Sequence, residues 1–206
     1  PSVRLCRQVK ETMPGSFLAR MSYDAAPGSK ADILHQEGEK YGAGKKWHFH
    51  PRLRPGDHTL NSHIVRVLLR SVGVDQHYHP TRFMEQYEEF MLTPGSHRDS
   101  WADNCLKMSF QLYEDAAGTK QLWECAIDEP MVWNVNNTSP YLRSLPLAVF
   151  LMTTQGLAEE AAAEEVRQHE FLTHRTHTLD RYRLPLIKLF AALLRRLDDE
   201  AGAVAS

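Results

Sequence analysis

The sequence predicts an all-α protein. Apolar residues recur at helical spacing through most of the chain after residue 56, and glycine or proline interrupts each run. Alternation of β-branched residues, the pattern of a half-buried strand, is nearly absent. The chain has 206 residues, of which 42% are hydrophobic, enough for one domain with a sizeable core. We therefore predict a single domain over 1–206, with a loop-rich segment at 1–56 and a helical core at 57–197.

The first 56 residues are expected to be mostly loops. Glycine and proline are frequent there, as at Pro14-Gly15, Pro27-Gly28 and Pro55-Gly56. Within this segment only Ile33 to Tyr41 suggests a helix, and a short one. The chain opens on Pro1 rather than Met, so we expect a processed or incomplete domain.

Three helices are predicted in the first half of the core. The first runs from about Thr59 to Ser71 and ends near Gly73. The second begins near Pro80, a residue suited to a first helical turn, and Pro94-Gly95 ends it. The third begins at Ser100, a good N-cap. The apolar faces are Leu60, Ile64, Val67, Leu68 and Val72, then Phe83, Met84, Tyr87, Phe90 and Met91, and then Trp101, Cys105, Met108 and Leu112.

Three more helices are predicted in the second half. The fourth follows Ser139-Pro140, ends at Gly156 and contains Pro146, which we expect to bend it. The fifth, rich in alanine, covers about Leu157 to Phe171. The sixth covers about Leu184 to Leu197, and the residues from Asp198 onward are expected to form a frayed tail. The apolar faces of the fourth and sixth helices are Leu142, Leu145, Val149 and Met152, and Leu186, Ile187, Phe190, Leu193, Leu194 and Leu197.

Composition excludes several classes of function. The net charge is -2, so we expect no nucleic-acid partner, and no apolar run has membrane-spanning length. The three cysteines, Cys6, Cys105 and Cys125, form no CxxC pair, which indicates a reducing, cytoplasmic compartment. The eleven histidines include no HExxH motif, and the sequence therefore does not predict a dedicated zinc site. The oligomeric state stays open.

One polar segment lies at the start of the first predicted helix, Gly56-Asp57-His58-Thr59. Oxygen and nitrogen donors gathered at a helix N-terminus can bind a hard cation or orient a water molecule. The alternative is an ordinary helix cap, in which Asp57 or Thr59 satisfies the first free N–H groups.

Two later segments also lead from a polar loop into a helix. Pro94 to Ser100 carries Ser96, His97 and Arg98, a combination that suits a phosphate group at a helix N-terminus. Asn136 to Arg143 is a similar candidate for an anion or for sugar hydroxyls. For both segments the alternative is a polar turn with a serine cap.

Taken in order, these three segments and Leu172-Thr173-His174 resemble the ADP-ribosylglycohydrolase family, which includes the crystallin J1 proteins. The stretch from Ser22-Tyr23 to Asp32-Ile33-Leu34-His35 is also similar to one branch of that family. The resemblance covers residues 20–195. It lies in the order and spacing of the motifs rather than in any single one.

The resemblance implies an all-α orthogonal bundle that hydrolyses the glycosidic bond joining ADP-ribose to a modified acceptor, assisted by Mg²⁺. Asp57 and Thr59 match the second and fourth positions of the family's T-D-D-T metal motif, whereas Gly56 and His58 depart from it. By this resemblance Asp57 and Thr59 bind the metal, and Asp57 and His58 are catalytic. The substrate-binding residues are Ser96, His97, Arg98, Asn137, Thr138, Ser139 and Arg143.

The chain also departs from the family. It has no counterpart of the second acidic metal motif, D-x-D-T, and Thr138 stands where the family has glycine. The resemblance therefore leaves two interpretations: a hydrolase acting on ADP-ribosylated substrates, or a catalytically inactive homologue that binds ADP-ribose or serves as a crystallin-like structural protein.

Overall fold

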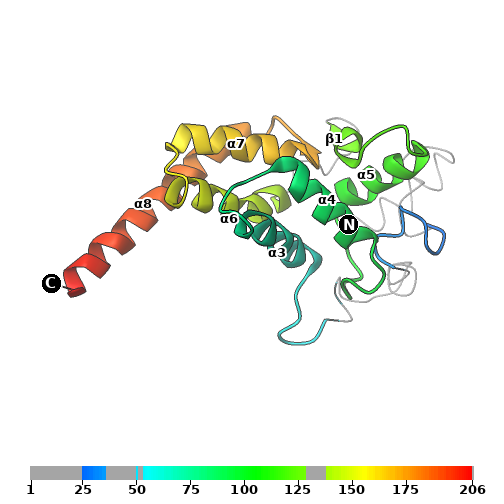
Figure 1. Ribbon diagram of the computed structural model, residues 1–206, viewed down its shortest axis with the longest axis horizontal. Coiled ribbons are helices and arrows are strands. Elements are labelled where there is room, and N and C mark those ends of the chain that lie inside the picture. Colours follow the sequence, from blue (N-terminus) through cyan, green and yellow to red (C-terminus); the bar gives the residue numbers. More distant parts are fainter. Residues whose placement is uncertain (1–24, 36–49, 51–52, 129–137, 206) are drawn as a thin grey trace.

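The computed structural model describes residues 25–35, 50, 53–128 and 138–205, with side chains described as far as Leu197. The all-α prediction is confirmed, because helices make up most of this part of the chain (Figure 1). Whether the bundle is of the ADP-ribosylglycohydrolase type stays a prediction. None of the helices in the described ranges has both the length and the apolar character needed to span a membrane.

Helices α3 (Leu60–Gly73) and α4 (Pro80–Leu92) pack against each other across a short loop. Thr59 caps α3, because its hydroxyl accepts a hydrogen bond from the backbone N–H of Ser62. Pro80 occupies the first turn of α4, where its missing N–H costs nothing. Both starting points agree with the sequence prediction.

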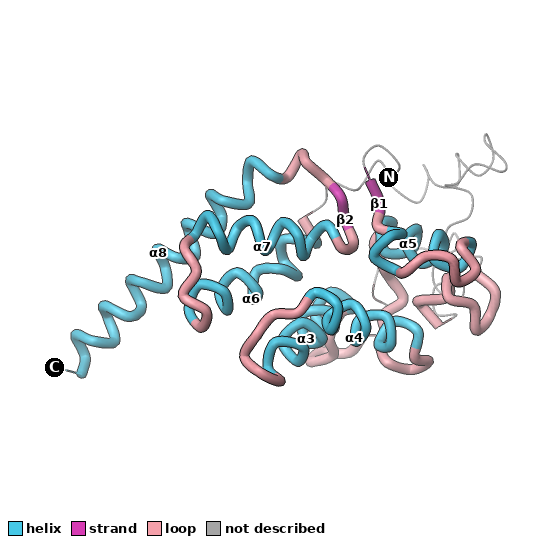
Figure 2. Tube along the Cα trace, turned by 45° about the horizontal axis from the view of Figure 1, so that its top comes forward, coloured by secondary structure: helices cyan, strands magenta, loops and turns pink. Residues whose placement is uncertain are grey.

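Helix α6 (Ser139–Thr153) lies at the centre of the bundle. It packs against α3, α7 (Glu159–Phe171) and α8 (Asp180–Ala205), and α7 also packs along α8. The far end of α8 projects beyond the other helices to the C-terminal end of the chain (Figures 1 and 2). Pro146 lies inside α6, which nevertheless remains one helix.

A second group of elements lies beside this bundle. Helix α5 (Asn104–Asp115) packs on the 3₁₀ turn η3 (Leu122–Cys125). The two-residue strands β1 (Ile127–Asp128) and β2 (His174–Arg175) pair in parallel, with Ile127 opposite His174 (Figure 2). This pairing holds the segment after α7 close to the first turns of α5, and it therefore fixes the position of His174.

The structure corrects the predicted ends of two helices. The third predicted helix begins at Asn104 and not at Ser100, because Asp103 is the residue whose carboxylate accepts the N–H of Leu106. The sixth begins at Asp180, four residues before the predicted start, and continues to Ala205 without the expected frayed tail. Pro185 lies inside this helix, near its N-terminal end.

Two smaller differences concern the fourth and fifth predicted helices and the first 56 residues. Helix α6 ends at Thr153, before Gly156, and α7 begins at Glu159. The short helix predicted at Ile33 to Tyr41 is not formed at residues 33–35, which lie in turns, and residues 36–41 lie outside the described part of the chain.

A buried ion pair joins α7 to α8. The guanidinium of Arg183 donates two hydrogen bonds to one carboxylate oxygen of Glu170, at 2.9 and 2.6 Å. The other oxygen accepts a hydrogen bond from the hydroxyl of Ser144 on α6, at 2.7 Å. Burial raises the pKa of Glu170, although the charge of Arg183 acts against this. The pair therefore ties together the three helices α6, α7 and α8.

We expect the change Arg183→Leu to lower the free energy of unfolding by about 3–5 kcal/mol, because it leaves the carboxylate of Glu170 buried without its partner. Urea unfolding measures this loss. The matched control is Arg195→Leu on the same helix, whose exposed pair with Glu159 is worth about 0–1 kcal/mol. Equal losses in the two variants would contradict this account of the buried pair.

Candidate functional site

The first turns of three helices meet around the guanidinium of Arg143. This side chain lies one turn inside α6 and is only 4% exposed. One of its terminal nitrogens, Nη1, lies 3.4 Å from the amide oxygen of Asn61 on α3 and 3.4 Å from a carboxylate oxygen of Asp103 at the start of α5. The other, Nη2, contacts the ring of His174 on β2. We call this meeting point the helix junction.

Aspartates shape the helix junction by accepting backbone N–H groups. Asp103 caps α5 through its bond from Leu106, at 2.9 Å. Asp99 reaches from the preceding loop to accept the first N–H of α3, that of Leu60, at 2.8 Å. Its other oxygen accepts the N–H of Trp101 at 3.1 Å. The loop before α5 is thereby bound to the start of α3.

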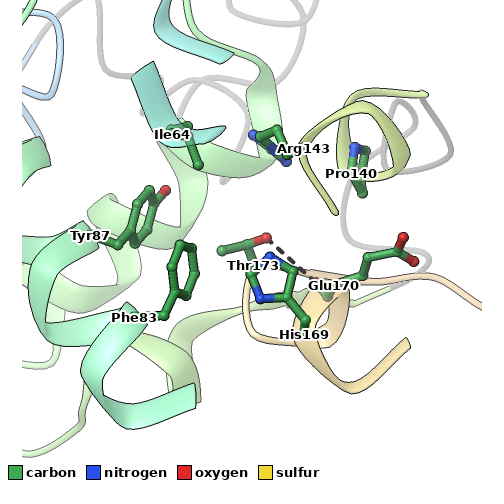
Figure 3. Close-up of a pocket in the computed structure, with 8 residues that line it drawn as sticks. All are labelled: Ile64, Phe83, Tyr87, Pro140, Arg143, His169, Glu170 and Thr173. Atoms are coloured by element: carbon green, nitrogen blue, oxygen red, sulfur yellow. Dashed lines mark hydrogen bonds between the residues drawn. The ribbon is translucent and has the colours of Figure 1, made fainter. Parts of the chain in front are cut away.

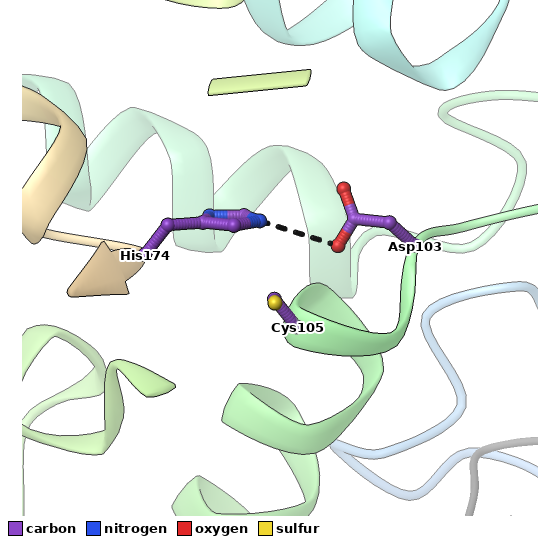
Figure 4. Close-up of side chains that lie close together, drawn as sticks. All are labelled: Asp103, Cys105 and His174. Atoms are coloured by element: carbon purple, nitrogen blue, oxygen red, sulfur yellow. Dashed lines mark ion pairs between the residues drawn. The ribbon is translucent and has the colours of Figure 1, made fainter. Parts of the chain in front are cut away.

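Asp103, Cys105 and His174 form a compact group at the helix junction (Figure 4). One ligand atom from each lies within 4.8 Å of those of the other two, and all three side chains are buried. In the part of the chain that the structure describes, this is the group of His, Cys, Asp or Glu side chains that could hold a metal ion.

The charges in this group are set by burial and by Arg143. Burial by itself raises the pKa of Asp103, but the neighbouring His174 and Arg143 outweigh it and hold that pKa well below its usual range. Burial lowers the pKa of His174 and raises the pKa of the Cys105 thiol. Without a metal, the group therefore contains an Asp103 carboxylate paired with Arg143, a neutral imidazole and a neutral thiol.

Arg143 is also one of the residues that line a small cavity (Figure 3). Helices α3, α4, α6 and α7 line it, with Ile64, Tyr87 and His169 among the lining side chains. Its volume is about 10 Å³, which is room for one water molecule. A nucleotide-sized ligand does not fit in this cavity.

The structure places Asp57 and His58 on the surface, in the loop before α3. A carboxylate oxygen of Asp57 accepts the backbone N–H of Arg54 at 2.9 Å, which closes a local turn. The imidazole of His58 lies against that of His63, with 5.6 Å between ring centres. Thr59 serves as the N-cap of α3, which is the alternative interpretation that the sequence analysis gives for this segment. Their catalytic and metal-binding roles stay predictions.

The second predicted segment is partly buried. His97 is enclosed: its Nε2–H donates to the carbonyl oxygen of Ile33 at 2.9 Å, and its Nδ1 accepts the N–H of Asp99 at 3.2 Å. Arg98 is exposed. The hydroxyl of Ser96 is buried and has no hydrogen-bond partner among the described residues. Of this segment, Arg98 is thus the side chain best placed to meet a ligand from solvent.

The third predicted segment supplies the centre of the helix junction. Arg143 lies there, whereas Thr138 is exposed and Ser139 is half-buried at the start of α6. Asn137 lies outside the described residues. Because Arg143 is buried and already paired with Asp103, its part in this structure is to hold the elements together. Direct contact between Arg143 and a substrate stays a prediction.

The sequence analysis did not identify Asp103 or Cys105 as site residues, and it discounted the histidines as metal ligands. The signal for Asp103 was present, since an Asp followed three residues later by the apolar Leu106 fits the first turn of a helix. No spacing or motif in the sequence connects Cys105 with His174. The pairing of β1 with β2 brings them together.

Asp57 and Thr59, which are expected to bind Mg²⁺, are not part of a set of converging ligands in the described residues. Asp57 offers an exposed carboxylate, but the hydroxyl of Thr59 is engaged in capping, and neither residue belongs to the group of possible metal ligands. Mg²⁺ prefers several oxygen ligands in octahedral order. The residues at this loop therefore do not fit a resident Mg²⁺, and we assign no chemical step to it.

Comparison with known proteins identifies no relative of this chain. The chain matches no protein family, no curated protein and no solved structure. The function therefore has to be argued from the residues themselves.

The depressed pKa of His97 predicts a pH dependence of stability. Burial lowers this pKa from 6.5 to about 4. The contribution of the neutral His97 imidazole to stability is complete above pH 6.5 and is lost as the pH falls towards 4. Over that range the unfolded chain binds a proton at His97 that the folded chain does not. We expect a loss of about 3 kcal/mol over this range, since each pKa unit corresponds to about 1.4 kcal/mol.

Chemical unfolding between pH 7 and pH 4 measures this effect. In His97→Gln the dependence on pH should be weaker by about that amount, whatever the stability of the variant at pH 7. His77→Gln, which changes an exposed histidine, should keep the slope of the unmodified protein. An unchanged slope in His97→Gln would refute the assignment.

Proposed function

We propose that this protein acts on ADP-ribosyl groups, as an ADP-ribosylglycohydrolase-like hydrolase that cleaves the glycosidic bond between ADP-ribose and a modified acceptor. One observation carries the proposal. Two of the four segments on which the resemblance depends contribute Arg143 and His174, which contact each other at the helix junction. The other two segments adjoin each other, because Asp99 accepts the backbone N–H of Leu60, the residue that follows Thr59.

The binding surface in this proposal is the exposed side of the helix junction. Asp99 accepts the N–H of Leu60, which brings two loops together. Arg98 precedes Asp99 on one loop, and His58 lies two residues before Leu60 on the other. The N-termini of α3 and α5 carry partial positive charge, and Asp99, Thr59 and Asp103 accept N–H groups of their first turns. Together with the guanidinium of Arg98 this partial positive charge suits the diphosphate of ADP-ribose.

A larger hollow elsewhere is a poorer candidate for that ligand. It has a volume of about 530 Å³ and lies by the C-terminal end of α6, beside α7 and α8. Its lining includes two carboxylates, Glu159 and Glu160, and its arginine, Arg195, is already paired with Glu159. A diphosphate would therefore meet net negative charge there.

In the proposed reaction Asp57 accepts a proton from the attacking water, which His58 positions; the water oxygen bonds to the anomeric carbon of the ribose as the bond to the acceptor breaks, and the departing acceptor takes up a proton from solvent. Both side chains are exposed beside the proposed diphosphate site and can reach a bound ligand. Glycosidases commonly use two carboxyl groups. In this chain His58 stands in place of one of the two carboxyl groups.

A specific observation favours a second candidate, a homologue that binds ADP-ribose without cleaving it. Asp57 does not belong to any cluster of acidic and histidine ligands in the described ranges, so it lacks the partner carboxylate that hydrolysis of a glycosidic bond normally uses. Binding needs only the cationic donors.

We expect Asp57→Asn to lower the rate of ADP-ribose release from an ADP-ribosylated peptide by about 10²–10⁴-fold, the usual contribution of a general base. Release is measured by chromatography, with arginine-linked and serine-linked substrates. Asp75→Asn, which changes an exposed aspartate paired with Arg82, is the control and should keep full activity.

The outcomes separate the candidates. Hydrolysis that survives in Asp57→Asn would remove Asp57 from the mechanism. Binding of ADP-ribose without hydrolysis by the unmodified protein would establish the second candidate in place of the first. Neither binding nor hydrolysis would overturn both.

We also expect Arg98→Ala to weaken the affinity for ADP-ribose by about tenfold, because one charge-assisted hydrogen bond is lost. Calorimetric titration measures the dissociation constant. Arg66→Ala, on the exposed face of α3, is the matched control and should bind as the unmodified protein does. Equal affinities in all three proteins would show that the diphosphate does not lie against the loop before α5.

A further inference from the structure

The group of Asp103, Cys105 and His174 goes beyond the proposed function, because its donors differ from those of an Mg²⁺ site. It combines a carboxylate oxygen, a thiol sulfur and an imidazole nitrogen. Sulfur and imidazole ligands favour Zn²⁺ and similar metals, whereas Mg²⁺ takes oxygen ligands. The choice of donors therefore points to a different class of ion from the one that the resemblance implies.

The spacing of the donors suits a tetrahedral ion. Ligand atoms bound to Zn²⁺ at about 2.0–2.3 Å in tetrahedral order lie roughly 3.3–3.8 Å from one another. The Oδ1 atom of Asp103 already lies 3.4 Å from the Nε2 atom of His174. One ligand atom from each of the three residues lies within 4.8 Å of those of the other two, so closing the site requires side-chain shifts of about 1 Å or less.

Arg143 does not occupy the position that the ion needs. Its Nη2 atom lies 3.1 Å from Nδ1 and 3.3 Å from Nε2 of the same His174 ring. A point at these distances lies over the face of the ring, because in the ring plane it would collide with the carbon between the two nitrogens. The in-plane lone pair of Nε2 therefore stays directed away from Arg143, and the Nη1 atom of Arg143 contacts Oδ2 of Asp103 and not Oδ1.

A neighbouring hydroxyl holds the ring in the orientation that metal binding requires. The Nδ1 atom of His174 lies 3.0 Å from the hydroxyl oxygen of Thr173. When Nδ1–H donates to that oxygen, the lone pair at Nε2 is available to a metal. Metal-binding histidines are usually oriented in this way by a second hydrogen bond.

We propose that Asp103, Cys105 and His174 bind one Zn²⁺ ion, through Oδ1, Sγ and Nε2, with a water molecule as the fourth ligand. Binding converts the Cys105 thiol to a thiolate: the S–H proton passes to solvent as the Zn–S bond forms, and no electron is transferred. The thiolate and the Asp103 carboxylate supply two negative charges to the ion, and with Arg143 still paired through Oδ2 the group carries one net positive charge. The ion would join the first turn of α5 to β2.

Cobalt(II) is the probe that tests this site, because a thiolate bound to Co²⁺ gives a charge-transfer absorption band in the near ultraviolet. The experiment uses the full chain with Cys6 and Cys125 both changed to Ser, so that Cys105 is the one remaining thiol. After treatment with a chelator, this variant should develop the band on addition of one equivalent of Co²⁺. One equivalent of Zn²⁺ should abolish the band, and excess Mg²⁺ should leave it unchanged.

Two further variants assign the ligands. Cys105→Ser, with the other two cysteines retained, should show no band, and His174→Gln in the single-thiol chain should bind Co²⁺ at least tenfold more weakly. Circular dichroism identifies a variant that fails to fold. A folded single-thiol chain that gives no band would overturn the proposal, and so would a folded His174→Gln variant that binds Co²⁺ as tightly as the single-thiol chain. Neither result depends on hydrolysis or on ADP-ribose binding, so the proposed function stands or falls separately.

Discussion

The arrangement of this protein depends on one buried cation. An arginine side chain cannot lose its proton inside a protein, so the chain that buries Arg143 must bring acceptors to it. Asp103 supplies the compensating charge and at the same time caps α5, while Asn61 extends the contact to α3. The guanidinium of Arg143 therefore links α6 to the first turns of α3 and α5, beside the apolar core that these helices share.

The regular helices could be predicted from the sequence because their determinants are local. The apolar stripe of α3 and the proline that begins α4 act within a few residues, and both predictions are confirmed. The start of α5 could not be predicted in this way. Ser100 and Asp103 are both good caps, and the choice between them depends on Asp99, which is committed to the start of α3. The start of α8 likewise depends on the partner of Arg183 on another helix.

The same distinction explains what was predicted of the site. Arg143 was identified from its place one turn inside a helix that follows a polar loop, and the structure places it at the centre of the helix junction. The metal-ligand group was not identified, because searches by spacing look for ligands on one element, whereas Asp103, Cys105 and His174 come from a loop, a helix and a strand. Two pairs of residues in β1 and β2 bring them together. Strands this short leave no pattern in the sequence.

The bonds at the helix junction also bear on the order in which the chain folds. The contact between Asn61 and Arg143 spans 82 positions, and the one between Leu60 and Asp99 spans 39. By contrast, α6 and α7 follow each other directly and close a short loop. Closing long loops is entropically unfavourable until enough contacts form to offset it, so the local helix pairs assemble before the long-range contacts. We therefore expect the amide of Leu60, which is bonded to a carboxylate far along the chain, to become protected from hydrogen exchange only when folding is complete, and so to distinguish the native protein from a collapsed bundle of correctly formed helices.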